Sequence, residues 1–172
     1  WPEQPAGDDF SGDTLSPQWQ TLREPAEESW CTLNAEPGVL RLKGRHYLSS
    51  RFDQSLLARR IEHHRIRAET LVDFHPQSPM QMAGLVVYYD NANYYFLKIS
   101  RDDNGDKTVQ VCASIAGEYC EPGGSGLMGD KARIESEQPL YLRVTLDTQW
   151  YQFSYSTDGR HWASIGPRLN ST

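Results

Sequence analysis

Acidic side chains are the residues of this sequence whose type is suited to hydrolytic chemistry, and several occur as adjacent pairs. The chain holds 23 Asp and Glu residues, including the pairs Asp8-Asp9, Glu27-Glu28 and Asp102-Asp103. Cleavage of a glycosidic bond needs two carboxyl groups that face each other across the bound sugar. Neighbouring residues on a strand point to opposite faces, so an adjacent pair does not supply this geometry. We interpret these residues as solvated turn carboxylates and predict no catalytic or substrate-binding residue.

Histidine and acidic side chains could also bind a metal ion. His63-His64 is the main histidine pair, but neighbours on a strand do not face one metal and no third ligand lies nearby. The acidic segment 102–106 lacks the ligand spacing and the closing Glu of an EF-hand, so a hairpin turn is the preferred interpretation. The sequence also lacks a nucleophile elbow and a phosphate-binding glycine loop.

The number and spacing of the cysteines indicate the redox state of the cellular compartment in which the protein folds. Cys31, Cys112 and Cys120 form no C-x-x-C pair and no zinc spacing. A bond between Cys112 and Cys120 across a hairpin is one alternative, but free thiols in a reducing compartment are the preferred interpretation. The sequence begins at Trp1 and shows no signal peptide, although a targeting signal could lie upstream. The predicted location is the cytoplasm, of a bacterial type of cell.

Charge and composition exclude two classes of partner. The 172 residues carry a formal charge of -6, and such an acidic surface repels phosphate backbones, so we predict no nucleic-acid partner. No apolar run approaches the roughly 20 residues that span a bilayer, so we predict no membrane contact. Aromatic residues make up 11% of the chain, which favours strands.

The elements that position these side chains are strands. Apolar residues alternate with polar ones over 65–74, 140–146 and 150–156, the period of a strand with one buried face. Residues 82–89 and 94–99 are more continuously apolar, as expected of central strands covered on both faces. Many short strands with regular turns predict an all-β sandwich or barrel.

Turn residues separate these strands. Residues 90–93, the segment 102–106 and Asp158-Gly159 carry the Asn, Asp and Gly residues of tight turns. The only candidate for a helical turn is 53–57. Residues 1–7, with two prolines, are interpreted as an interdomain linker.

Blocks of residues along the whole chain, in a fixed order, carry the most specific signal. They are Asp8-Asp9-Phe10, Trp19-x-x-Leu22-Arg23, Pro37-Gly38-x-Leu40-Arg41-Leu42-x-Gly44, the segments 54–60, 68–70, 73–76 and 81–85, Tyr88-Tyr89, the segment 141–144, and Tyr151-x-Phe153-x-Tyr155-Ser156-x-Asp158-Gly159-x-x-Trp162. These blocks resemble the C-terminal domain of glycoside hydrolase family 43 β-xylosidases. The resemblance implies an antiparallel two-sheet jelly-roll sandwich of the concanavalin A type over residues 8–172.

The resemblance also implies a function. In that family the sandwich follows a five-bladed β-propeller that holds the catalytic carboxylates, and nothing in this sequence matches the propeller's motifs. We therefore expect a non-catalytic accessory domain of a β-xylosidase, of the xylan 1,4-β-xylosidase and α-L-arabinofuranosidase type. It is expected to pack on the propeller of the same protein and to help shape an exo-acting pocket. Xylo-oligosaccharide is expected to bind only in that pocket of the parent enzyme. The intact enzyme is expected to be a homo-oligomer, and residues 1–172 to lack the family's final strands and pocket-closing loop.

Calcium is an open alternative within this resemblance. Many jelly-roll, lectin-like sandwiches bind a structural calcium where the first and last strands meet, and Asp9 in Asp8-Asp9-Phe10 suits that role. The late Asp that would complete the site has no counterpart in residues 1–172. No other cofactor is expected.

A free-standing carbohydrate-binding module is the alternative function. Exposed aromatic rings stack on the C–H faces of sugars, which makes the chain's tyrosines and tryptophans relevant. The candidates are Trp19, Trp30, Tyr88, Tyr89, Tyr94, Tyr95, Trp150 and Trp162. Most of them are expected to be packing residues of a β protein.

Overall fold

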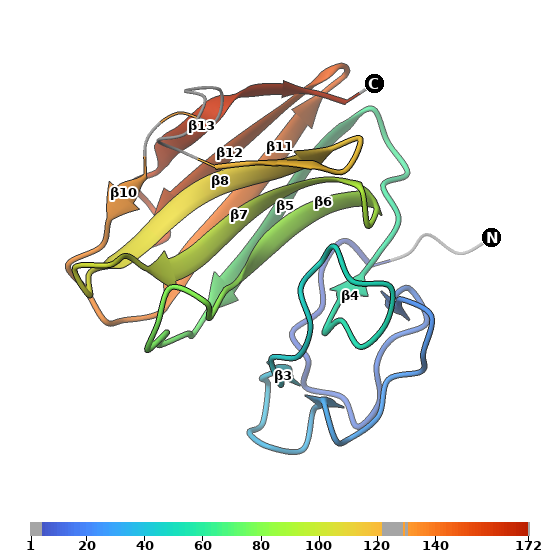
Figure 1. The fold of residues 1–172 in the computed structure, drawn as a ribbon. Coiled ribbons are helices and arrows are strands. Elements are labelled where there is room, and N and C mark those ends of the chain that lie inside the picture. Colours follow the sequence, from blue (N-terminus) through green and yellow to red (C-terminus); the bar gives the residue numbers. More distant parts are fainter. Residues whose placement is uncertain (1–4, 122–128, 130, 172) are drawn as a thin grey trace. The chain divides into compact units, whose positions relative to one another are not determined.

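The chain consists of strands, turns and loops in a computed structural model that describes residues 5–121, 129 and 131–171 (Figure 1). It divides into two compact units, which we call the N-terminal unit (Trp1–Ile61) and the sandwich unit (Glu62–Thr172). The described residues contain no helix, and hence none long and apolar enough to cross a bilayer.

The sandwich unit contains two antiparallel sheets. One sheet has the order β13-β12-β11-β5, and the other has the order β10-β8-β7-β6 with β9 also paired to β8. The strands are β5 (Arg65–Val72), β6 (Ala83–Asp90), β7 (Asn93–Arg101), β8 (Lys107–Ile115), β9 (Glu118–Cys120), β10 (Ala132–Arg133), β11 (Leu140–Asp147), β12 (Trp150–Ser156) and β13 (Ala163–Asn170). The predicted all-β, antiparallel two-sheet architecture is confirmed.

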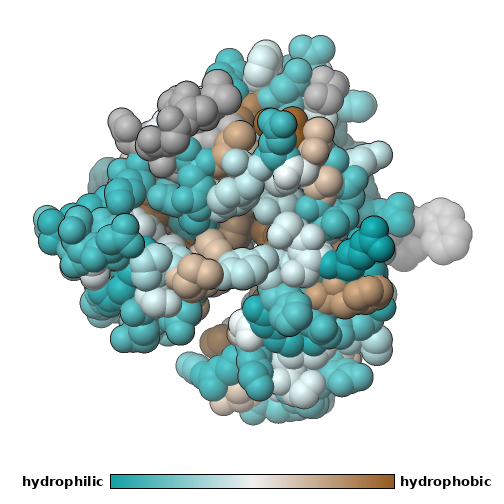
Figure 2. All heavy atoms as spheres, in the orientation of Figure 1, coloured by the Kyte–Doolittle hydropathy of each residue, from teal (hydrophilic) through white to brown (hydrophobic). Residues whose placement is uncertain are grey.

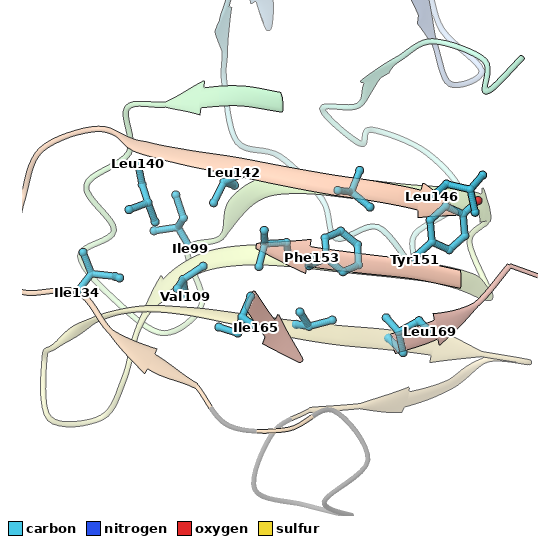
Figure 3. Packing of buried hydrophobic residues seen from close by; sticks show 14 residues of the cluster. Ile99, Val109, Ile134, Leu140, Leu142, Leu146, Tyr151, Phe153, Ile165 and Leu169 are labelled. Carbon is cyan, nitrogen blue, oxygen red and sulfur yellow. The ribbon is translucent and has the colours of Figure 1, made fainter. Parts of the chain in front are cut away.

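Alternating apolar residues of both sheets form the core between them (Figure 3). On β5, Ile66 and Ala68 pack against this core, whereas Arg65 and Arg67 are exposed, which confirms the predicted alternation. Leu142 and Phe153 from one sheet and several residues of β7 and β8 from the other are fully buried. Burial of each such side chain stabilises the fold by about 1.5–3 kcal/mol.

The predicted turns connect these strands. The Asp102 carboxylate accepts hydrogen bonds from the backbone N–H groups of Asn104 and Asp106, both at 3.0 Å, and Gly105 has a φ of +84°. The segment 102–106 is thus the hairpin turn between β7 and β8. Gly159, with a φ of +71°, lies in the turn between β12 and β13.

Within its described residues 5–61, the N-terminal unit forms only two-residue strands. β1 (Gln20–Thr21) pairs with β4 (Leu57–Ala58), and β2 (Cys31–Thr32) pairs with β3 (Arg41–Leu42). All longer strands lie in the sandwich unit. The sequence predicts a linker at 1–7 and a single sandwich at 8–172, and it does not predict two units. These bounds stay a prediction.

The predicted helical turn at 53–57 is wrong. Asp53 has a φ of +62°, in the left-handed region where an L-residue does not continue a right-handed helix. Gln54 instead forms a parallel bridge with His46, and its side-chain amide donates to the backbone oxygen of Ser50. Nearby, Arg45 lies over the Trp30 ring, 4.5 Å from its centroid, and forms an ion pair with Glu24.

Candidate functional site

Asp8 organises the start of the N-terminal unit. Its carboxylate accepts hydrogen bonds from the backbone N–H of Phe10 at 2.9 Å, from Ser16 Oγ at 2.8 Å and from Trp19 Nε1 at 2.7 Å. These donors favour the ionised form, and they lower the pKa of Asp8. The Phe10 and Trp19 rings pack with centroids 5.6 Å apart. Asp8 therefore acts as a structural anchor of this loop.

Asp9, the predicted calcium ligand, is exposed at a shallow depression that Gly7, Asp8 and Ser16 also line. One of its oxygens accepts hydrogen bonds from Ser11 Oγ at 2.7 Å and Ser11 N at 3.0 Å, which lower the pKa of Asp9. Calcium takes 6–8 oxygen ligands. Within residues 5–121, 129 and 131–171, no three acidic, His or Cys side chains are grouped to hold a metal.

This donor set does not fit a calcium site as it stands. Both oxygens of the Asp8 carboxylate already accept hydrogen bonds from N–H or O–H groups, and Asp9 is the one further carboxylate at the depression. The role of Asp9 in calcium binding stays a prediction, and we derive no function through it.

The other acidic pairs serve turns and ion pairs. Asp102 forms an ion pair with Lys131 at 3.3 Å in addition to its backbone bonds. Glu28 accepts a hydrogen bond from Asn34 Nδ2 at 2.7 Å. These contacts agree with the interpretation of turn carboxylates, because neither residue faces a second carboxylate in the described contacts.

The histidine that contacts carboxylates is His75, which the sequence did not single out. His63 and His64 are exposed before β5, whereas His75 lies between two carboxylates, 3.0 Å from Asp73 and 3.5 Å from Glu137. Glu137 also forms an ion pair with Arg101 at 3.3 Å. The partners Asp73 and His75 are an i, i+2 pair, but Glu137 is brought to them only by the fold.

A polar cluster around the buried Lys98 of β7, formed with Tyr119 of β9 and with Glu121, was also missed. Lys98, only 4% exposed, places Nζ 2.5 Å from Glu121 Oε1, and the Tyr119 hydroxyl donates to the same oxygen at 2.5 Å. Burial raises the pKa of Tyr119 far above its usual range. Burial also opposes ionisation of Glu121, but the hydrogen bonds from Lys98 and Tyr119 outweigh it and lower the pKa of that carboxyl.

The cysteines of the described residues are free thiols, as predicted. Ala113 lies opposite Cys120 in the β8–β9 pair, so the side chains of Cys112 and Cys120 point to opposite faces of the sheet. A hairpin disulfide between them is thereby excluded in this register. Burial raises the pKa of Cys112, which leaves its thiol protonated and unreactive.

The aromatic candidates do not form a sugar-stacking platform. Trp30 and Tyr94 are buried, and the others pack in or beside the sheets, with the exception of Tyr89 at 86% exposure and Trp150 at 41%. Tyr89 and Trp150 belong to different sheets, since β6 and β12 do not share one. On the face shown in Figure 2, hydrophobic residues are scattered among hydrophilic ones. A carbohydrate-binding module is therefore not favoured.

Comparison with known proteins identifies the fold and its family. The profile of the beta-xylosidase C-terminal concanavalin A-like domain matches residues 7–172. The chain belongs to this family. The two antiparallel sheets are thus those of a concanavalin A-like sandwich, and the predicted resemblance is confirmed.

Relatives of this β-xylosidase C-terminal domain are parts of longer proteins. The chain is 48% identical over its 172 residues to a xylan 1,3-beta-xylosidase of Vibrio sp, and 36% identical over 169 residues to a putative beta-xylosidase of Escherichia coli. These matches include 100% and 95% of this chain, respectively, but only 31% of each relative. The chain thus spans about a third of the length of the curated relatives that it matches.

Solved structures agree with this assignment. The xylan beta-1,4-xylosidase of Bacillus halodurans matches with a TM-score of 0.91 and 33% identity, over 99% of this chain and 32% of that one. The protein BlXynB of Bacillus licheniformis, from glycoside hydrolase family 43, matches with a TM-score of 0.84 and 30% identity, over 95% and 30% of the two chains. The chain is accordingly an accessory C-terminal domain of family 43 xylosidases.

Proposed function

We propose that this domain acts within a longer β-xylosidase, where it supplies contact surface and shape while bond cleavage takes place elsewhere in that polypeptide. The family match over residues 7–172 carries the proposal. Four described carboxylates support it, because Asp8 and Asp102 accept hydrogen bonds within turns, whereas Glu121 and Glu137 form ion pairs. A glycosidase pair would need one protonated and one ionised carboxyl group across a sugar-sized space.

The domain is proposed to pack on the catalytic domain of the same protein and to help shape an exo-acting pocket. A domain that closes one end of a cleft leaves room for few sugar units, which restricts cleavage to chain ends. Interdomain surfaces of this kind commonly bury about 600–1,500 Å². The length of the relatives supports the proposal, because about two thirds of each lies outside the match.

Xylosides are the proposed substrate class of the longer protein. The Vibrio relative is a 1,3-β-xylosidase, whereas the Bacillus halodurans structure is that of a β-1,4-xylosidase. The expected 1,4 specificity is therefore one of two linkages that the names of the relatives support. Assembly into a homo-oligomer and a reducing compartment are proposed as well, the latter because the three cysteines are free.

Three preparations test the proposal: the full-length polypeptide, the 172-residue domain, and the remainder of the protein without it. Each is assayed on 1,3- and 1,4-linked xylobiose, with light scattering for the oligomeric state. We expect hydrolysis by the full-length protein, none by the domain, and reduced activity of the remainder that rises when the domain is added. The domain carrying Gly84→Ala, which we expect to misfold, is the control for that addition.

Turnover by the isolated domain would refute the accessory role. Saturable binding of xylobiose to the isolated domain by calorimetry would favour a binding module instead. Full activity of the remainder alone, with an unchanged KM, would show that the domain does not shape the pocket.

A further inference from the structure

Backbone pairing is much weaker in the N-terminal unit than in the sandwich unit. In the described residues 5–61, β1 to β4 have two residues each and form two separate pairs (Figure 1). The main strands of the sandwich unit have seven to nine residues and pair within two sheets of four and five strands. A pair of short strands is marginally stable by itself. Sheet hydrogen bonds therefore stabilise chiefly the sandwich unit.

The N-terminal unit also has a small apolar core. Within residues 5–61 the buried apolar side chains are Trp30, Cys31 and Leu56, whereas fourteen buried residues form the core of the sandwich unit. Phe52 of the N-terminal unit stays 65% exposed. Burial of apolar surface is the main favourable contribution to folding, and a segment of about 60 residues supplies little of it.

Several buried polar atoms of the N-terminal unit have no hydrogen-bond partner among the described residues. They are Nε2 and Oε1 of Gln18, Nε1 of Trp30 and Oε1 of Gln54. Each hydrogen bond that is not formed again after burial lowers the stability of the folded state. Phe10 and Arg23 add to this cost, because they have φ values of +55° and +66°, which residues other than glycine adopt unfavourably.

The segment that joins the two units is exposed. Residues 59–64 belong to no strand, and the side chains of residues 60–64 are exposed. Arg59 donates to the backbone oxygens of Pro5 and Ala6 at 3.2 Å, within the N-terminal unit. Boundaries between separately folding parts of a chain commonly lie in exposed segments of this kind.

We propose that the N-terminal unit is a cooperative unit of its own, which unfolds and refolds while the sandwich unit stays folded. Native proteins open in contiguous cooperative units, and the least stable unit opens most often. The family match over residues 7–172 includes both units, so it does not imply this division. The N-terminal unit is thus an element that changes between an ordered and an open state without loss of the sandwich fold.

Two buried cysteines report on the two units. Cys31 lies in the N-terminal unit and Cys112 on β8 of the sandwich unit, so each thiol reacts with a maleimide only when its surroundings open. Peptide mass spectrometry of the labelled 172-residue chain gives both rates, each divided by the rate in the urea-unfolded chain. We expect Cys31 to react at least about 100-fold faster than Cys112. Cys120, which is only partly buried, is the control for the activity of the reagent.

The dependence of these rates on urea distinguishes opening of the whole unit from a local fluctuation. The acceleration by urea scales with the surface that opening exposes, so we expect a clear acceleration for Cys31 and a steeper one for Cys112. Equal rates for the two thiols would overturn the proposal. A Cys31 rate that does not respond to urea would also overturn it, because only the surroundings of that thiol would then open.

Two matched leucine variants test whether the units open independently. Leu56 is 7% exposed in the N-terminal unit, and Leu169 is 6% exposed on β13 of the sandwich unit. We expect Leu56→Ala to accelerate labelling of Cys31 at least about 10-fold and to leave Cys112 unchanged, because the lost burial destabilises one unit.

The variant Leu169→Ala should do the reverse, with faster labelling of Cys112 and an unchanged rate for Cys31. Equal acceleration of both thiols by either variant contradicts the proposal, since it indicates one cooperative unit. Labelling is measured without a xyloside, so this inference and the proposed function can fail separately.

Discussion

The guanidinium of Arg143 stacks on the indole of Trp162, with its central carbon 3.4 Å from the ring centroid. The same guanidinium donates through Nε to Glu69 at 2.9 Å, so one side chain of β11 joins β5 to the segment before β13. Tyr141 meets the Trp162 ring edge-on at 6.5 Å. The side chain of Arg143 is only 19% exposed, which strengthens both interactions relative to a fully solvated pair.

We expect Arg143→Ala to lower the free energy of unfolding by about 1–2 kcal/mol, because it removes the stacking and the ion pair together. Arg143→Lys retains the charge but not the planar stacking and should recover less than half of the loss. Urea unfolding measures both variants. The control is Arg67→Ala, whose side chain is 66% exposed and 3.9 Å from the same Glu69, and for which we expect a change below about 0.5 kcal/mol. Equal losses in Arg143→Ala and Arg67→Ala would exclude a special role of the Trp162 stack.

Asp8 should make the N-terminal unit sensitive to acid. Its pKa is lowered in the folded chain, so its contribution to stability is present above the unfolded value of about 3.9 and is lost as the pH falls through the folded value. Asp8→Asn keeps one acceptor oxygen but not the charge, and should cost about 1 kcal/mol at pH 7.

The measurement for Asp8 is thermal unfolding between pH 7 and pH 2.5. The difference between the original chain and Asp8→Asn should shrink as the pH falls below about 4. The exposed residue Asp13 supplies the control Asp13→Asn, for which we expect no such convergence. A difference that is constant over the whole pH range would show that the charge of Asp8 is irrelevant.

Gly84 is the position at which backbone contact forbids a side chain. A Cβ at this residue would collide with the backbone carbonyl of Leu97 on β7, which cannot give way without loss of the β6–β7 register. We expect Gly84→Ala to destabilise the sandwich unit by about 3 kcal/mol or more. Gly44→Ala is the matched control, because a Cβ there meets nothing within 4 Å. Urea midpoints that fall by similar amounts in both variants would contradict this assignment.

The sequence predicted the strands of the sandwich unit well because their signal is local. On β5 the alternation from Ile66 to Val72 is sufficient to assign the buried face. The helical turn at 53–57 failed because a single backbone angle, the positive φ of Asp53, decides that segment. Of the sequence block 37–44, only Arg41–Leu42 forms a strand, and its described partner is the two-residue β2.

The side-chain clusters were beyond prediction because strand register creates them. Lys98 and Glu121 are 23 residues apart and meet only through the pairing of β7 with β8 and of β8 with β9. The same holds for Glu137 and His75. In the sequence, the one available signal was a lysine within the apolar run 94–99, and a lysine there is interpretable only once its partner is known.

The two side chains of the Lys98–Glu121 ion pair differ in burial, and this difference leads to a prediction. The Lys98 side chain is 5% exposed, whereas that of Glu121 is 40% exposed. Removal of the carboxylate leaves an ammonium group in a dry site, where its other described partners are Tyr119 OH and Met82 Sδ, both at 3.4 Å. Removal of the ammonium leaves a carboxylate that water can reach. A buried charge without its partner is the costlier state.

We therefore expect Glu121→Gln to cost about 2 kcal/mol or more of unfolding free energy and Lys98→Met to cost about 1 kcal/mol or less. The double variant should be more stable than Glu121→Gln alone, because no unpaired charge stays buried. A double-mutant cycle by urea unfolding gives all three values and the coupling energy. A larger loss of stability in Lys98→Met than in Glu121→Gln would contradict the prediction that an unpaired Lys98 ammonium is the costlier state.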